Sequence, residues 1–321
     1  MITIPVRVCG DHWINPEEVQ TLLDSAAGND IVVLDLQFEG PSLTALGIIE
    51  CVSAYCRKYQ VSSAQIQIKH WTNNAEPVEY PVIDANSISH FFSRSKSYWQ
   101  PLSVSVHEHV LGFFIGRRSI PRAVIMHYLH HTYLNKVLLS CLQNKDDQPW
   151  LKRSHDLEKL DIWLTQEQQI EFTNWWKTDP IASLDDHGIL DQYRLDPTTN
   201  RDLLTHYTRF DIELVAESYT RGSSFFPTEK TVRPIMAAKP ILVYGPANYL
   251  ENLCKLGFET YSKSWDESYD LLEGPARWRA MQKLIDKIMD MNTDEYKEMI
   301  GQATEIAIRN RKHLSDIVNK K

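Results

Sequence analysis

The sequence has few of the residues that build disulfide-rich or zinc-ribbon proteins. Only 5 of its 321 residues are cysteines, the number is odd, and no Cys-x-x-Cys pair occurs. Scattered cysteines of this kind argue against a disulfide framework and against a zinc ribbon. We expect reduced and mostly buried thiols, as in an intracellular protein. The five are Cys9, Cys51, Cys56, Cys141 and Cys254.

Long apolar runs are also missing. A membrane-spanning helix needs about 20 predominantly apolar residues, and no segment here approaches that length. The first residues, MITIPVRVCGDHW, have no charged region followed by a long apolar core, so we expect no signal peptide. We predict a cytoplasmic protein without a transmembrane segment. Peripheral contact with a membrane stays open, although the small basic run at 309–312 fits a solvated helix face better.

Positive charge is in short supply. The chain has 34 Lys and Arg against 42 Asp and Glu, which gives a net charge of −8. Sequence-independent binding of nucleic acid requires a dense basic surface. We therefore expect no nucleic-acid partner, whereas a local basic site for a small anion is compatible with this balance.

Three common catalytic motifs are absent from the chain. There is no GxSxG nucleophile elbow and no GxxxxGK[ST] phosphate loop. No GxGxxG follows the first predicted strand. Serine hydrolases, P-loop enzymes and Rossmann-type oxidoreductases therefore lose their main support.

What the N-terminal part does contain is an alternation of strands and helices. Residues 6–10 and 31–38 are short and apolar, as buried strands are, and 15–28 between them has the signals of a capped helix. A helix at 42–59 and a strand at 64–71 follow. This β-α-β-α-β order predicts an open α/β sheet.

A second α/β series begins near residue 109. Its first part is predicted as strand 110–116, turn 117–122, helix 123–136 and strand 136–142. Its second part is predicted as strand 212–219, helix 228–239, strand 240–245 and helix 247–257. Two long helices follow, at 276–291 and 293–317. We predict an α/β protein with two Rossmann-like domains that face a cleft, one from 1–105 and one from 106–321. An insertion near 143–206, which has a helix at 164–177 and no strand signal, interrupts the second domain.

The stretch ESYTRGSSFFPTEK, residues 217–230, has the chemistry of an anion site. Glu217 ends a predicted strand, and ligands of open α/β sheets bind at that edge. Thr228 is suited to cap the next helix, whose first amides and dipole favour a phosphate. Lys230 adds a positive charge, and Glu229 can accept hydrogen bonds from ribose hydroxyls.

The preceding aromatic residues complete this interpretation. Phe225 or Phe226 can stack on a nucleotide base. Together the stretch predicts a site for a nucleoside diphosphate group. The three residues TEK, taken alone, fit a second interpretation equally well. They could simply begin a capped surface helix, with Glu229 and Lys230 facing water.

The order of motifs over about residues 86–300, leaving out 143–206, resembles the donor-binding region of α1,3-fucosyltransferases. That family has a strand ending in Phe-Glu-Asn, then Tyr-x-Thr-Glu-Lys, a helix, a strand, Gly and Asn-Tyr. Ser218 here replaces the asparagine, and Phe226 replaces the tyrosine that stacks on the base. The matching positions are 216–218, 226–230, 237–240, Gly245, and Asn248 with Tyr249.

The resemblance implies a GT-B fold and an inverting, metal-independent transfer of a sugar to a glycan or other hydroxyl acceptor. It implies a nucleotide-sugar donor, with GDP-fucose as the first candidate, and no separate cofactor. The second domain would bind the donor, with Arg122 and Lys230 stabilising the leaving diphosphate. The other donor contacts would be Glu217, Ser218, Phe226, Thr228 and Glu229.

A general base should come from the N-terminal, acceptor-side domain, because inversion takes the acceptor proton on the face opposite the donor. Glu76 and Glu39 are the candidates, and each also fits a solvated loop acid. A catalytically silent GT-B-like module that binds a glycan or a protein is the alternative function.

No metal site is predicted. His127, His130 and His131 have a helical spacing that can bind zinc, but the glutamate of HExxH is absent, so we interpret them as structural. The acidic pairs at 146–147 and 185–186 do not follow a clear buried strand. We interpret the tryptophan pair at 175–176 as packing residues of the insertion.

Overall fold

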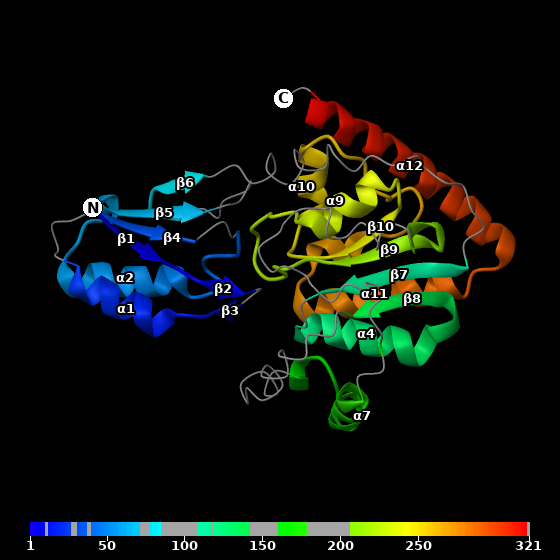
Figure 1. Cartoon of the computed structure of the whole chain (residues 1–321), viewed down its shortest axis with the longest axis horizontal. Helices are drawn as coiled ribbons and strands as arrows, with labels where there is room; N and C mark the ends of the chain where they lie inside the picture. The colour runs from blue at the N-terminus through cyan, green and yellow to red at the C-terminus, as the bar shows by residue number, and fades with distance from the viewer. Residues whose placement is uncertain are drawn as a thin grey trace.

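The computed structural model describes residues 1–9, 12–26, 31–36, 40–70, 78–84, 108–116, 119–141, 160–178, 181 and 206–319. Two parallel sheets with helices packed against them make this an α/β protein, as the strand and helix alternation predicts (Figure 1). One sheet is built from residues before 85 and the other from residues after 108. The domain boundary predicted at 105 and most of the predicted insertion lie outside the described residues.

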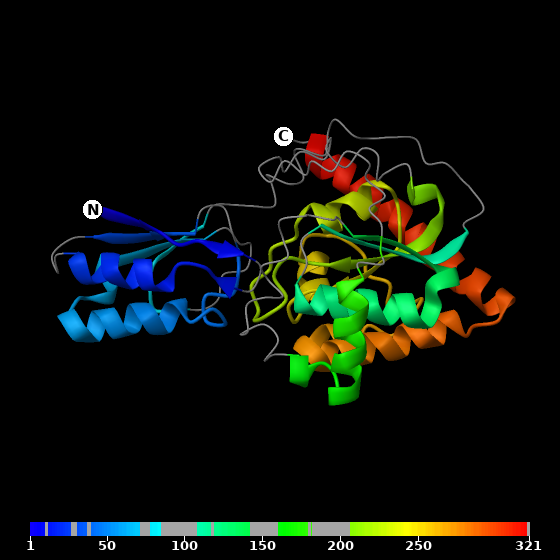
Figure 2. The same ribbon diagram turned by 60° about the horizontal axis from the view of Figure 1, so that its bottom comes forward.

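The N-terminal sheet has the order β1-β4-β5-β6, and its strands are all parallel. Its two helices lie on the same face of the sheet (Figure 2). Strands that follow one another in sequence order, joined by right-handed crossovers, place their helices in this way. The elements are β1 Ile2–Pro5, α1 Pro16–Ser25, β4 Val32–Asp35, α2 Ile48–Tyr59, β5 Ile66–His70 and β6 Val82–Asp84.

The prediction of a first strand at 6–10 is wrong. The first strand of the parallel sheet is Ile2–Pro5, and β2 (Val8–Cys9) instead pairs antiparallel with β3 (His12–Trp13). Pro5 has no N–H to donate, and it is tolerated because it ends a strand that lies at the edge of the described sheet.

Asn15 precedes α1 but does not cap it with its side chain. Its side chain instead accepts a hydrogen bond from the backbone N–H of Arg7 at 2.8 Å and donates to the carbonyl of Pro5 at 3.0 Å. The side chain therefore fastens the β2–β3 hairpin to the end of β1.

The C-terminal sheet has the order β10-β9-β7-β8, again with all strands parallel. The chain moves from β7 to β8 in one direction and from β9 to β10 in the other, so right-handed crossovers put α4 and α9 on opposite faces (Figure 1). The order reverses between β7 and β9, and ligands of open α/β sheets bind outside the carboxyl ends at such a point. The elements are β7 His109–Ile115, α4 Ile120–Tyr133, β8 Val137–Cys141, β9 Phe210–Ala216, α9 Glu229–Met236 and β10 Ile241–Tyr244.

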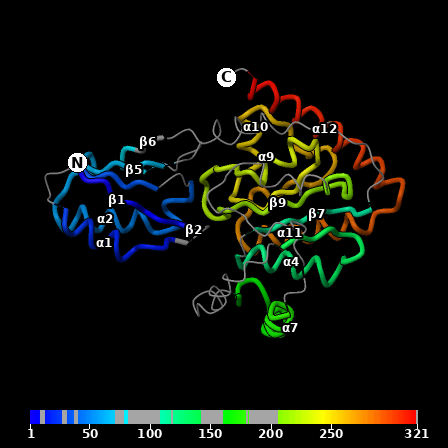
Figure 3. Tube along the Cα trace, in the orientation of Figure 1, coloured from blue at the N-terminus to red at the C-terminus, as the bar shows by residue number. Residues whose placement is uncertain are grey.

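Further helices surround this second sheet. The 27-residue helix α12 packs against α9 (Figure 3). No helix in the described ranges is both long and apolar enough to cross a membrane. The remaining helices are α7 Gln166–Lys177, α10 Tyr249–Lys255, α11 Gly274–Met289 and α12 Thr293–Asn319, with short 3-10 turns at Ser63–Gln65, Leu134–Lys136, Leu160–Ile162, His206–Thr208 and Ser268–Leu271.

Arg277 of α11 fixes the loops that follow β10. It is fully buried and donates hydrogen bonds to the carbonyls of Val243 and Pro246 at 3.0 and 2.9 Å. Its guanidinium also pairs with the Asp270 carboxylate at 2.8 Å. The other oxygen of Asp270 accepts from the backbone N–H of Leu250 at 2.9 Å. The carboxyl end of β10 and the start of α10 are thus held by one buried ion pair.

Gly112 of β7 lies against the aromatic ring of a residue on the neighbouring strand. A Cβ atom at this position would meet the ring of Phe210, on the neighbouring strand β9, at 2.9 Å. Phe210 is fully buried, so its ring has little room to move. We expect Gly112→Ala to lower the free energy of unfolding by about 1–3 kcal/mol, measured by urea denaturation.

Gly301 is the matched control for this substitution. It lies within α12, and a Cβ there meets no described atom within 4 Å. We expect Gly301→Ala to stabilise the protein by up to about 1 kcal/mol, because alanine is the better helix former. An equal effect of the two substitutions would contradict the close packing of Gly112 against Phe210.

Candidate functional site

Glu217, the residue after β9, is the centre of a buried hydrogen-bond network. Its side chain is 1% exposed. The carboxylate accepts hydrogen bonds from the backbone N–H and the hydroxyl of Thr228, at 3.1 and 2.5 Å. It also accepts from the hydroxyls of Thr231 at 2.6 Å and Tyr249 at 2.9 Å. Glu217 therefore joins the end of β9 to the starts of α9 and α10. Its contact with a nucleotide-sugar donor stays a prediction.

Thr228 caps α9, and this confirms the predicted helix start. Its hydroxyl accepts a hydrogen bond from the backbone N–H of Lys230 at 3.3 Å, and its carbonyl accepts from the N–H groups of Thr231 and Val232. Glu217 supplies a negative charge at the same helix start, where the helix dipole favours one. The amides predicted to meet a phosphate are therefore engaged, in part, by the protein itself.

Lys230 and Glu229 form an ion pair beside this cap. The Nζ atom of Lys230 lies 2.6 Å from a carboxylate oxygen of Glu229 and 3.2 Å from the hydroxyl of Ser218. The side chains are 16% exposed for Lys230 and 28% exposed for Glu229. The structure thus brings together three of the residues predicted from the sequence, with both charged groups still reaching solvent.

The ion pair determines the ionisation of Glu229. Burial acts to raise the pKa of Glu229, but the Lys230 ammonium, together with the backbone N–H of Glu229 and the nearby Arg233, lowers this pKa from 4.5 to about 2. A carboxyl group whose pKa is lower in the folded state contributes stability above its unfolded pKa. That contribution is lost as the pH falls from 4.5 towards 2.

We expect Glu229→Gln to lower the free energy of unfolding at pH 7 by at most about 3 kcal/mol, since one pKa unit corresponds to about 1.4 kcal/mol. The difference from the wild type should shrink below pH 4.5, because the wild-type Glu229 begins to take up a proton there in the unfolded state. Urea denaturation at pH 7, 5 and 3.5 measures this. A difference that stays constant with pH would show that the ion pair does not set this pKa.

Arg122 reaches the same edge of the sheet from the other side of the switch point. It lies in the first turn of α4, is 4% exposed, and donates from Nε and Nη2 to the carbonyl of Ala216 at 3.2 and 2.9 Å. Ala216 is the last residue of β9. The helix begins at Ile120, before the predicted turn ends, because a proline such as Pro121 is compatible with a first helical turn. A phosphate contact by Arg122 stays a prediction.

Both phenylalanines of the 217–230 stretch are core residues. Phe225 is 2% exposed and Phe226 is 5% exposed. Phe225 packs edge-on against Tyr249, with ring centroids 5.0 Å apart, and Phe226 packs in the same way against Tyr219 at 5.7 Å. These contacts hold the loop against the core, and stacking of Phe226 on a base stays a prediction.

The loop before α9 also touches the N-terminal part of the chain. The hydroxyl of Ser224 donates to the carbonyl of Pro41 at 3.2 Å, and Nε2 of His70 lies 2.7 Å from the same oxygen. Pro41 follows β4, and His70 is the last residue of β5. Loops at the carboxyl ends of strands in both sheets therefore meet. The candidate bases Glu39 and Glu76 lie outside the described residues.

Three residues that shape this region were not identified from the sequence. His70 and Ser224 each contact a residue distant along the chain, so no short motif marks them. Thr231 had one usable signal, because it stands one helical turn after Thr228 and so lies on the same face of α9. Tyr249 was noted only as part of the Asn-Tyr match, and its hydrogen bond to Glu217 was not predicted.

Trp175 and Trp176 are 8% and 6% exposed, which confirms that they are packing residues. They belong to α7, the helix predicted at 164–177.

Comparison with known proteins provides no related protein from which the role of this site could be inferred. No protein-family model matches the chain, and a search of curated proteins finds no similar sequence. The resemblance to α1,3-fucosyltransferases therefore depends on the order of the sequence motifs alone.

Proposed function

We propose that this protein is an inverting, metal-independent glycosyltransferase of the GT-B type, which moves a sugar from a nucleotide donor to a glycan or another hydroxyl acceptor. One observation carries the proposal. Two cationic side chains from different elements, Arg122 of α4 and Lys230 of α9, border the end of β9 at the point where the strand order reverses. That is where an open α/β sheet binds its ligand.

The proposed reaction assigns a role to each charge. The acceptor oxygen attacks the anomeric carbon of the donor sugar, and the bond from that carbon to the diphosphate oxygen breaks. Negative charge develops on the departing nucleoside diphosphate, and Arg122 and Lys230 are the residues that we propose to stabilise it. The acceptor proton passes to a carboxylate on the opposite face.

The surroundings of Lys230 support a role on the donor side. Its ammonium is held between the hydroxyl of Ser218 and the carboxylate of Glu229. Because the pKa of Glu229 is lowered to about 2, this carboxylate is ionised at neutral pH and can accept hydrogen bonds from ribose hydroxyls. A GDP-sugar, with GDP-fucose first, is the donor that we propose to test.

The acceptor side is proposed to be the N-terminal sheet. The contact between Ser224 and Pro41 joins the loops that follow strands of the two sheets, as a site shared by two domains requires. Of the two candidate bases, Glu39 stands two positions before Pro41 in the chain. We therefore place Glu39 before Glu76 as the base to be substituted first.

Calorimetric titration with GDP, UDP, ADP and CMP, each with and without magnesium, tests the proposal. We expect GDP to bind preferentially, with the same affinity in the two conditions. Binding should be lost in Lys230→Ala and kept in Lys255→Ala, whose lysine forms an exposed surface pair with Glu251. A preference for UDP would keep the reaction class and overturn the GDP donor. Binding of none of the four would overturn the nucleotide site.

A second candidate is a catalytically silent GT-B-like module that binds a glycan or a protein. It is favoured by the Glu217 carboxylate, which already occupies the start of α9 and competes with a phosphate for that position. Nucleotide binding without any sugar transfer to a panel of glycan acceptors would support this alternative.

A further inference from the structure

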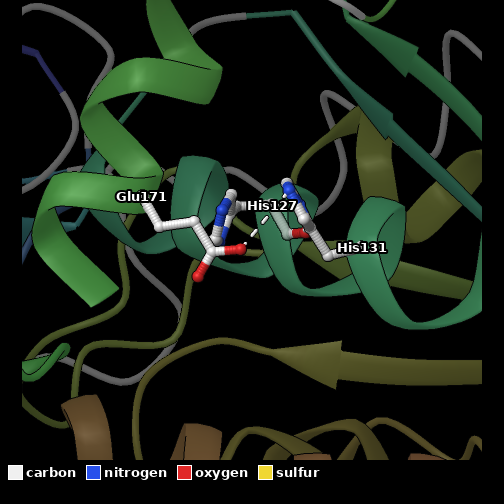
Figure 4. Close-up of side chains that lie close together, drawn as sticks. All are labelled: His127, His131 and Glu171. Atoms are coloured by element: carbon white, nitrogen blue, oxygen red, sulfur yellow. Dashed lines mark hydrogen bonds and ion pairs between the residues drawn. The ribbon is translucent and has the colours of Figure 1, made fainter. Parts of the chain in front are cut away.

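Helices α4 and α7 pack against each other and bring together three side chains of types that can bind a metal. His127 and His131 stand one turn apart on α4, and Glu171 of α7 points towards them (Figure 4). One ligand atom from each of the three lies within 4.8 Å of the others. Glu171 is 40 residues beyond His131 in the chain, so only the packing of α7 on α4 creates this group.

His131 already has the orientation of a metal ligand. Its Nδ1 atom lies 3.1 Å from the carbonyl of His127, which accepts a hydrogen bond when Nδ1 carries the proton. In that tautomer Nε2 presents its lone pair, and this atom lies 3.6 Å from a carboxylate oxygen of Glu171. Histidines that bind metals are commonly fixed in this way, by a backbone carbonyl on the other ring nitrogen.

His127 provides an independent observation in favour of a metal at this position. Its side chain is buried, 8% exposed, and Nε2 has no hydrogen-bond partner among the described residues. Buried polar atoms in folded proteins almost always have a partner. The ring packs edge-on against Phe172 and Trp175, with centroids 5.5 and 5.0 Å away, so these apolar neighbours cannot provide one.

The neighbouring His130 is held apart from this group. Its Nδ1 atom accepts a hydrogen bond from the indole N–H of Trp175 at 3.2 Å. That bond fixes α7 on α4 and leaves the two histidines one turn apart, His127 and His131, to face Glu171.

We propose that His127, His131 and Glu171 bind one divalent transition-metal ion, with Zn²⁺ the preferred ion, and that this ion fastens α7 to α4. Two imidazoles and one carboxylate form a three-ligand zinc set that leaves a fourth position for water. Imidazole donors favour zinc and similar ions over magnesium or calcium, which prefer oxygen ligands. The side chains of His131 and Glu171 are 37% and 57% exposed, so the ion can enter from solvent.

This metal site is separate from the proposed donor site. Arg122 lies on the same helix, but the donor chemistry proposed above uses no metal and runs through none of the three ligands. The two proposals can therefore fail independently, since nucleotide binding tests one and metal binding tests the other.

Titration of the chelator-treated full chain with ZnCl₂ alone, followed by calorimetry, tests the metal site. We expect one Zn²⁺ per chain and a rise in the melting temperature on binding. CoCl₂ in its place should give the visible absorption bands of a four-coordinate Co²⁺ site. His131→Ala and Glu171→Gln should each weaken Zn²⁺ binding by at least about tenfold.

These two variants should fold, because both side chains are partly exposed. Glu167→Gln is the control, since Glu167 is an exposed carboxylate one turn earlier on α7. It should bind Zn²⁺ as the wild type does. The absence of Zn²⁺ binding would overturn the proposal. Equal affinity in all of these variants would also overturn it and would indicate only adventitious surface binding.

Discussion

Lys230→Ala is expected to lower turnover with the true nucleotide-sugar donor by about 10²–10³-fold, the usual effect of removing one preorganised group that stabilises developing negative charge. The ammonium is held by Ser218 and Glu229, so it needs little rearrangement to meet a leaving diphosphate. Steady-state kinetics should show a loss in kcat as well as in kcat/KM, because the charge on the diphosphate grows in the transition state.

Lys255→Ala is the control for this measurement, since its lysine is 60% exposed and pairs only along the surface of α10. The fold should survive in both variants, which circular dichroism and urea denaturation can verify. A wild-type rate in Lys230→Ala would show that this side chain does not bind the diphosphate, and the glycosyltransferase proposal would then lose the charge on which it depends.

Glu217→Ala is expected to cost about 3–5 kcal/mol of stability, because it leaves several buried donors without an acceptor, at about 1–3 kcal/mol each, and removes buried volume. The substitution leaves the hydroxyls of Thr228, Thr231 and Tyr249 without their common acceptor and opens a cavity between β9 and α9. Urea denaturation at pH 7 measures the loss.

Glu217→Gln separates the anchoring role from a role in donor binding. The amide keeps the size of the side chain and one oxygen acceptor, so we expect a smaller loss of about 1–3 kcal/mol. If Glu217 acts only as an anchor, the folded Gln variant should bind nucleotide as the wild type does. A stable Glu217→Ala variant would contradict the buried network. A Glu217→Gln variant that is stable but does not bind nucleotide would instead indicate that Glu217 contacts the nucleotide-sugar donor.

The elements of the C-terminal half could be predicted because their signals are local. The apolar run at 110–116 and the cap at Thr228 are read from neighbouring residues, and both agree with the structure to within a residue or so. The first strand could not be located in this way. Ile2–Pro5 is a strand because it pairs with Val32–Asp35, and the residues at 6–10 are equally apolar.

The candidate site shows the same division. Glu217, Thr228 and Lys230 stand within 14 residues, so their proximity could be predicted from a strand, a loop and a helix start. The anchoring role of Glu217 could not be predicted, because two of its hydrogen-bond donors, Thr231 and Tyr249, lie 14 and 32 residues away in the chain.

The sequence by itself determined the α/β class, the helix start at Thr228 and the gathering of charge between 217 and 230, because alternation of apolar runs and capping depend on residues close together in the chain. Tertiary structure alone decided which of those charges are buried. It also brought Glu171 to the histidines of α4, which the sequence led us to interpret as structural. Burial and metal-ligand geometry depend on contacts between distant segments, and only the packed sheets and helices create those contacts.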